Sequence, residues 1–172
     1  MYGTLEQTDA GPRLRFARRL AHPPEKVWRA LTDPDHLAAW FPQAVTVGKW
    51  KPGARLHFED AGVPEATFDG EVLAVEEPSL LEFSWGPDVL RFELRPEGDG
   101  TLLVLLDTLE TVGKAARDGA GWHLCLDRLE QHLDGAASSD NPSDAWRRVH
   151  EVYVEEFGPE AATIGPPEGA LD

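Results

Sequence analysis

The segment RDGAGWHLCLDRLEQHLDG, residues 117–135, decides the fold. Its apolar residues recur at steps of three and four and therefore share one helical face: Trp122, Cys125, Leu126, Leu129 and Leu133. Polar residues fall on the opposite side: His123, Asp127, Arg128 and Gln131. Asp118 or a neighbour is suited to begin this helix, and Gly135 to end it. A long helix with such a stripe requires a broad apolar surface to pack against.

The chain before this helix supplies that surface as short segments of alternating apolar and polar residues. Strands are predicted at 13–20, 44–47, 55–59, 66–75, 81–85, 90–95 and 101–110. Tight turns join most of them, as at Gly98-Asp99-Gly100, which is typical of an antiparallel meander with one apolar face. Residues 1–11 are polar and are predicted to be a loose lead-in.

Two short helices are predicted after the first strand, in EKVWRALTDPDHLAAWF at 25–41. Val27, Trp28 and Leu31 share a helical face, and Asp33-Pro34 ends one helix and starts the next. The predicted fold class is therefore α+β. A curved antiparallel sheet of about six or seven strands grips a long C-terminal helix.

The predicted domain covers residues 12–136, and 137–172 form a C-terminal extension. An amphipathic helix is expected at 143–157, capped by Ser143 or Asp144, with a stripe of Trp146, Val149, His150, Tyr153 and Phe157. The strand at 101–110 is also apolar on its outward side, through Leu102, Val104 and Leu106. We expect the tail helix to cover that outer face, or a homodimer to form through the outer face or through the tail helix. Residues 158–172 are expected to be extended or mobile.

Composition restricts the possible partners. The formal net charge of −15 repels phosphate backbones and anionic lipids, so no nucleic acid or membrane partner is expected. The sequence contains no apolar run long enough to span a membrane, and its start does not resemble a secretory signal. A single cysteine suits a reducing compartment, and a cytoplasmic location is predicted.

A search for catalytic and metal-binding motifs gives no candidate. The six histidines do not show a metal-ligand spacing, and Cys125 has no partner cysteine. The sequence has no GxSxG, phosphate-binding or dinucleotide-binding motif. We therefore predict no metal, no cofactor and no catalytic residue from motifs.

The order of strand, two short helices, further strands and long helix resembles the START-like (SRPBCC, helix-grip) superfamily. Four segments are similar to its activator-of-heat-shock-protein-ATPase-like branch: HPPEKVWRALTDPDHLAAWF, PGARLHFE, GEVLAVEEPSLLEFSW and GWHLCLDRLEQHL. The resemblance covers residues 13–135. It implies a cavity between sheet and long helix, where many relatives bind small lipophilic molecules and cyclase or dehydratase relatives carry out chemistry. The name of the branch comes from co-chaperones.

Asp107 departs from this branch, in which relatives often have histidine at that position. Alternation places it on the inner face with Leu103 and Leu105, where a carboxylate needs a partner, and Arg18 is the candidate. Two interpretations stay open: a polar anchor or proton acceptor in the cavity, or an ordinary carboxylate at the end of a strand. The tryptophans likewise either wall a pocket or fill a solid core.

The leading hypothesis is a protein that binds a small apolar or amphipathic ligand, without catalysis. The predicted ligand-binding residues are Arg18, Trp40, Phe58, Trp85, Phe92, Leu105, Asp107, Trp122 and Leu126. A protein-interaction module of the co-chaperone kind is the second hypothesis, and a cofactor-free cyclase or hydrolase is the third. The third would require an acid–base pair that faces the cavity.

Overall fold

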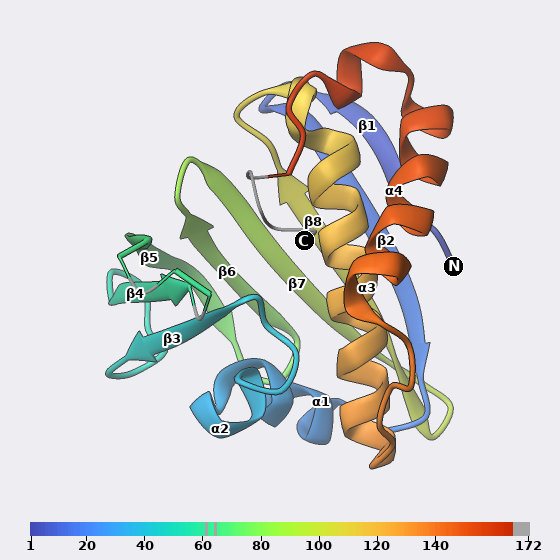
Figure 1. The fold of residues 1–172 in the computed structure, drawn as a ribbon. Coiled ribbons are helices and arrows are strands. Elements are labelled where there is room, and N and C mark those ends of the chain that lie inside the picture. Colours follow the sequence, from blue (N-terminus) through green and yellow to red (C-terminus); the bar gives the residue numbers. More distant parts are fainter. Residues whose placement is uncertain (61, 64, 167–172) are drawn as a thin grey trace.

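An antiparallel sheet curves around one long helix in the computed structural model, which describes residues 1–60, 62–63 and 65–166 (Figure 1). Within these residues the sheet has eight strands in the order β1-β2-β8-β7-β6-β5-β4-β3. They are β1 (Thr4–Thr8), β2 (Gly11–Leu20), β3 (Gln43–Val47), β4 (Arg55–Asp60), β5 (Thr67–Glu76), β6 (Leu80–Trp85), β7 (Asp88–Glu97) and β8 (Gly100–Thr108). The predicted α+β architecture is confirmed, with more strands than expected.

The additional strand is β1, which pairs antiparallel with β2 and places Leu5 opposite Leu14. The prediction that residues 1–11 form a loose lead-in is therefore wrong. The segment Thr4–Thr8 contains a single apolar residue, so it lacks the alternation that identifies a strand in sequence. Its polar character suits an edge strand, and Gly11 makes the turn into β2 with a φ of 122°.

The predicted helices at one end of the sheet and beneath it are confirmed. Helices α1 (Pro24–Thr32) and α2 (Pro34–Leu37) follow β2, and the Asp33 side chain caps α2 by accepting a hydrogen bond from the Asp35 N–H. A short 3₁₀ helix, η1 (Val112–Lys114), leads into the long helix α3 (Ala115–Asp134). Gly135 ends α3 with a φ of 70°. All five stripe residues of α3 are buried.

The C-terminal helix α4 (Pro142–Phe157) lies beside α3 (Figure 1). The prediction that it covers the outer face of the sheet is therefore wrong, while the dimer alternative stays a prediction. His123, which we expected on the solvent side of α3, is buried because Tyr153 of α4 lies over it, with the hydroxyl 3.1 Å from Nδ1. The cap of α4 is Asn141, whose side chain accepts hydrogen bonds from the N–H groups of Ser143 and Asp144.

The apolar outer side of β8 is shielded by its neighbouring strands. Val104 is only 8% exposed, whereas Leu102 and Leu106 are half-buried. The register places arginines on both sides of this row: Arg15 and Arg19 on β2, Arg91 and Arg95 on β7. Because arginine stems lie along apolar surface while their charged ends stay in water, these side chains can supply the cover that we had expected from the tail helix.

The end of the described chain returns to α3. A second 3₁₀ helix, η2 (Pro159–Ala162), follows α4, and the Ile164 N–H donates to the Gly113 carbonyl at 3.0 Å. Part of the stretch that we expected to be extended is therefore helical, and its last positions, 167–172, lie outside the described residues. Across the described part of the chain, every helix is too short or too polar to cross a membrane.

Candidate functional site

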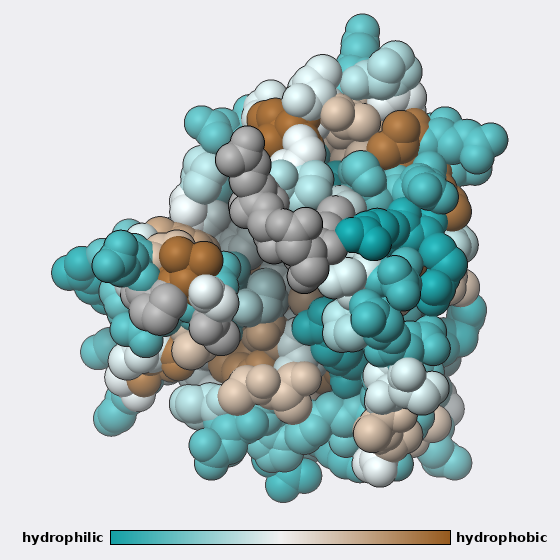
Figure 2. Space-filling view, in the orientation of Figure 1, coloured by the Kyte–Doolittle hydropathy of each residue, from teal (hydrophilic) through white to brown (hydrophobic). Residues whose placement is uncertain are grey.

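A cleft of about 340 Å³ lies beside α3, and we call it the tryptophan cleft. One wall is the flank of α3, with Asp118, Gly121, Trp122 and Cys125. The opposite wall is formed by Pro42 and by Trp85 at the end of β6. The start of α4 closes a third side with Pro142, Ser143 and Trp146. Figure 2 shows the surface hollowed between the lobe carrying β3, β4 and β5 and the helices.

Trp85 and Trp122 form the apolar centre of this cleft. Their ring centres are 5.2 Å apart at an angle of 58°. Both indole N–H groups already have partners: Trp85 donates to Oε1 of Gln43 at 3.0 Å, and Trp122 donates to Oδ2 of Asp107 at 2.9 Å. These bonds fix the orientation of the rings. Trp85 is half-buried and presents apolar surface to the cleft, whereas Trp122 is only 2% exposed and borders the cleft from the core side.

Asp107 lies directly behind Trp122 and is fully buried on β8, opposite Leu14 and Leu90. The Trp122 indole is the hydrogen-bond partner of Oδ2, whereas Oδ1 has no partner among the described residues. Burial raises the pKa of Asp107 well above its ordinary value, and the nearby carboxylates of Asp88 and Asp118 act in the same direction. The interpretation of Asp107 as a strand-end carboxylate near solvent is therefore excluded.

Asp88, Asp107 and Asp118 form a cluster whose facing oxygens all lie within 4.8 Å of one another. Asp88 begins β7, and its Oδ1 accepts hydrogen bonds from Lys114 Nζ at 2.6 Å and from the Glu110 N–H at 2.9 Å. Asp118 accepts a bond from Arg117 Nε at Oδ1, while its buried Oδ2 has no partner among the described residues. Burial also raises the pKa of Asp118.

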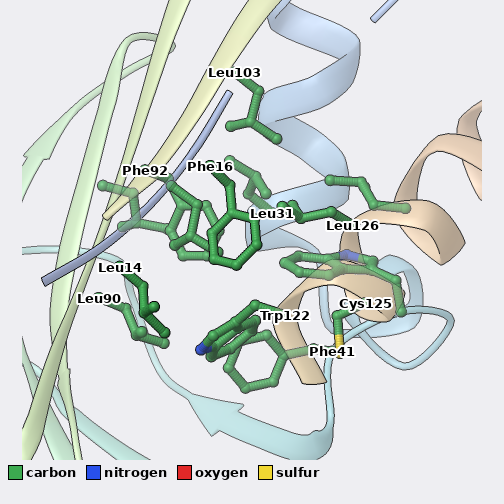
Figure 3. Packing of buried hydrophobic residues seen from close by; sticks show 14 of the residues in the cluster. Leu14, Phe16, Leu31, Phe41, Leu90, Phe92, Leu103, Trp122, Cys125 and Leu126 are labelled. Carbon is green, nitrogen blue, oxygen red and sulfur yellow. The ribbon is translucent and has the colours of Figure 1, made fainter. Parts of the chain in front are cut away.

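The structure brings three of the nine predicted ligand-binding residues to the tryptophan cleft: Trp85 and Trp122 line it, and Asp107 lies behind it. Five others pack in the continuous apolar core: Trp40, Phe58, Phe92, Leu105 and Leu126. Figure 3 shows the core side of this arrangement, where Trp122 points toward Leu14 and Leu90. Arg18 lies elsewhere, because its Nη1 pairs with Oδ1 of Asp127 on α3 at 2.6 Å. It is not the partner of Asp107.

Sequence reasoning missed Asp88 and Asp118 as members of the site. Asp88 is in phase with the buried residues Leu90 and Phe92 of β7, so extending the alternation backward would have placed it on the inner face next to Asp107. Asp118 carried no comparable signal. Its proximity to Asp107 depends on how α3 crosses the sheet, which the local sequence does not encode.

Cys125 behaves as a core residue at the edge of the cleft. Burial raises the pKa of its thiol to about 11, so the side chain stays a protonated thiol at neutral pH. This agrees with its interpretation as a small apolar residue of the helix stripe.

A second cleft, of about 480 Å³, lies at the C-terminal end of α3 against α1 and α2. Several of its polar groups already bond to one another or to the backbone. His36 Nδ1 is 2.8 Å from His132 Nε2, and Lys26 Nζ donates to the Leu133 carbonyl at 2.9 Å. Burial, followed by the charges of His36 and Lys26, lowers the pKa of His132. The Lys26 bond satisfies a backbone carbonyl at the C-terminal end of α3, so we assign the second cleft a structural role. We therefore take the tryptophan cleft as the candidate site.

Comparison with solved structures finds close agreement in fold. A conserved protein of unknown function from Enterococcus faecalis aligns with a TM-score of 0.75 at 22% identity over 90% of each chain. The solution structure of CalU16 from Micromonospora echinospora has a TM-score of 0.68 at 26% identity, covering 92% of this chain and 91% of that one. A protein from Mesorhizobium loti is 31% identical, with a TM-score of 0.62, over 73% of this chain and 99% of its own.

No functionally curated protein matches the chain. The family model described as activator of Hsp90 ATPase homolog 1-like protein matches residues 21–134, from the end of β2 to the last residue of α3. That match begins just after β2, so it includes strands β3 to β8 and the long helix that borders the tryptophan cleft, but not β1 and β2. The chain belongs to the activator of Hsp90 ATPase homolog 1-like family.

Proposed function

We propose that the protein binds one small amphipathic molecule in the tryptophan cleft. The observation that carries this proposal is the cleft between the half-buried Trp85 and the flank of α3 at Trp122, where both indole N–H groups are already bonded. A volume of about 340 Å³ is in the range of small-molecule pockets. A helix-grip fold is in general a ligand-binding or interaction module, which is consistent with this use of the cleft.

The polar end of the ligand is suggested by the rim of the cleft. Arg128 lines the cleft on α3 and is exposed, and among the described residues it has no hydrogen-bond or ion-pair partner. The chain carries a net charge of −15, and Arg128 places a cationic group at the rim of this cleft. It favours a ligand that carries an acidic group, because a guanidinium pairs well with a carboxylate or sulfonate.

The experiment uses two fluorescent probes with similar aromatic parts, the anionic 1-anilinonaphthalene-8-sulfonate and the neutral N-phenyl-1-naphthylamine. We expect both to bind the full chain with one site per molecule and to quench tryptophan emission. Arg128→Gln should weaken binding of the sulfonate by about tenfold, corresponding to about 1.4 kcal/mol, and leave the neutral probe nearly unchanged.

Gly121 provides a matched pair of variants that tests the location. A Cβ atom added at Gly121 meets nothing within 4 Å, so alanine fits at this position, and a larger side chain there would occupy space in the cleft that Gly121 lines. Gly121→Leu should abolish binding of both probes, whereas Gly121→Ala should keep it, and circular dichroism should show both variants folded. Equal binding by the wild type and Gly121→Leu would refute the tryptophan cleft as the binding site.

A further inference from the structure

We propose that Asp88, Asp107 and Asp118 form a binding site for one hard divalent cation, such as Ca²⁺, Mg²⁺ or Mn²⁺, beside the tryptophan cleft. The proposal is independent of the ligand proposed for that cleft. It rests on the convergence of three carboxylates from β7, β8 and α3, and on buried carboxylate oxygens that the protein leaves without partners.

The spacing of the oxygens fits a single ion. Calcium binds carboxylate oxygens at about 2.3–2.6 Å, so two ligands of one ion are at most about 5 Å apart. The facing oxygens of the three aspartates lie within 4.8 Å of one another, which allows all three to contact one ion. Because every donor is a carboxylate oxygen, the chemistry favours Ca²⁺, Mg²⁺ or Mn²⁺ over Zn²⁺ or Cu²⁺.

The unpartnered oxygens are a second, separate observation. Oδ1 of Asp107 and Oδ2 of Asp118 are buried and have no hydrogen-bond donor among the described residues. The Asp107 residue is 0% exposed and the Asp118 side chain 8%. Buried polar atoms in folded proteins nearly always have a partner, so two such oxygens in one cluster indicate that a ligand supplies the missing contact.

The charges of the cluster lead to the same inference. Lys114 neutralises Asp88, and Arg117 pairs with Asp118 through Oδ1. Asp107 has no cationic side chain in contact and accepts only the Trp122 N–H among the described residues. The charges of Asp88 and Asp118 disfavour an ionised Asp107, and the charge of Lys114 favours it. A bound cation would add to the favourable charge and provide the contacts that the two oxygens lack.

The site also has a route to solvent. Asp118 lines the tryptophan cleft, so an ion can reach the cluster from that side, and water in the cleft can complete its coordination. Mg²⁺ and Ca²⁺ commonly keep water ligands where a protein supplies only a few carboxylates. The cation would therefore be bound by three protein side chains and stay accessible from the cleft.

Terbium luminescence tests this site in the full chain, because Tb³⁺ is a luminescent substitute for Ca²⁺ that nearby tryptophans sensitise. Excitation of tryptophan should produce Tb³⁺ emission, since the Trp122 indole bonds directly to Asp107. Ca²⁺ should displace the Tb³⁺ in competition. Asp118→Asn should weaken Tb³⁺ binding by about tenfold or more, because it removes one of the three charged ligands.

Asp144→Asn is the matched control, because Asp144 is an exposed carboxylate on α4 outside the cluster. It should leave Tb³⁺ emission unchanged. Thermal unfolding gives a second readout: Ca²⁺ should raise the melting temperature of the wild type and of Asp144→Asn, but not of Asp118→Asn. Absence of sensitised emission, or equal emission from the wild type and Asp118→Asn, would overturn the proposal. So would an Asp107 carboxyl whose NMR signal shows it protonated and unaffected by Ca²⁺ at about 10 mM, above the weakest sites known in proteins.

Discussion

At the scale of single residues, the buried charges near the cleft have the largest energetic consequences. Lys114 and Asp88 form an ion pair at 2.6 Å in which the side chains are 8% and 2% exposed. Such a pair contributes little when both partners are present, but the loss of one partner leaves the other charged and buried. This asymmetry makes Lys114 more sensitive to substitution than the arginines on the surface of the sheet.

Lys114→Met should therefore reduce the free energy of unfolding by about 3–5 kcal/mol in buffer that contains a chelator. Arg19→Met is the control, because the Arg19–Glu97 pair is mostly exposed, with 69% and 44% of the side chains accessible. It should cost about 1 kcal/mol or less. Urea unfolding measures both values, and equal losses in the two variants would contradict the interpretation of Lys114 as a buried counter-ion.

His123 gives the protein a pH-dependent stability. Burial between α3 and α4 lowers its pKa below the ordinary value of 6.5; the Asp127 carboxylate opposes this shift, and the charges of Arg18 and the N-terminal amine reinforce it. A base with a depressed pKa in the folded state stabilises the protein above its unfolded pKa. That contribution is lost as the pH falls below about 6.5.

Asp107 and Asp118, whose pKa values burial raises, change stability with pH in the opposite direction, so the contribution of His123 is isolated by comparing variants. We expect the melting temperature of His123→Gln at pH 5, relative to its value at pH 7, to be higher than that of the wild type. His57 serves as the contrasting control. Its hydrogen bond with Asp69 raises its pKa, so its contribution to stability has the opposite sign. His57→Gln should therefore not raise the melting temperature at pH 5 relative to pH 7. Differential scanning calorimetry between pH 5 and pH 7 measures these melting temperatures. The same dependence of melting temperature on pH in the wild type and in His123→Gln would contradict the prediction.

At the scale of elements, the sequence predicts those whose apolar pattern is local. The α3 stripe, the strands β4 to β8 and the Asp33-Pro34 boundary between α1 and α2 each have a periodicity that is visible within a short window. β1 lacks such a pattern because it is a polar edge strand. The position of α4 was also not predictable, since an amphipathic stripe shows that a helix packs but not on which surface.

The candidate site was predictable to a similar extent. Trp85, Trp122 and Asp107 lie on faces that alternation or helical period identifies, and they meet at the cleft. Asp118, Gly121 and the residues at the start of α4 reach it only through the packing of α3 and α4, which depends on contacts between segments far apart in sequence.

A buried hydrogen bond joins α4 to Gly3, the residue just before β1: the Gly3 N–H donates to the Tyr153 hydroxyl at 2.8 Å. Tyr153→Phe removes the acceptor and leaves a buried N–H without a partner, so we expect a loss of about 1–3 kcal/mol. Amide exchange should become faster in β1 while the central strands β7 and β8 keep their protection. Uniformly faster exchange, or unchanged exchange in β1, would show that this bond does not couple the two elements.

At the scale of the whole molecule, the net charge of −15 acts against compactness, because carboxylates repel one another across the surface. Added salt screens this repulsion, with a Debye length that falls from about 30 Å at 0.01 M to about 8 Å at 0.15 M. We expect the melting temperature to rise between these two concentrations of NaCl. A fall would mean that the surface ion pairs contribute more to stability than the excess negative charge removes.

The residues that line the tryptophan cleft lie partly inside and partly outside the segment that the family model matches. Trp85 and Trp122 lie within the matched residues 21–134, whereas Pro142, Ser143 and Trp146 lie beyond them. If the proposed ligand site is correct, exchange of the C-terminal segment between relatives, with the sheet and α3 kept intact, should change which probe the cleft prefers. Chimeric proteins of this kind would distinguish the residues that determine the fold from those that determine which small molecule binds.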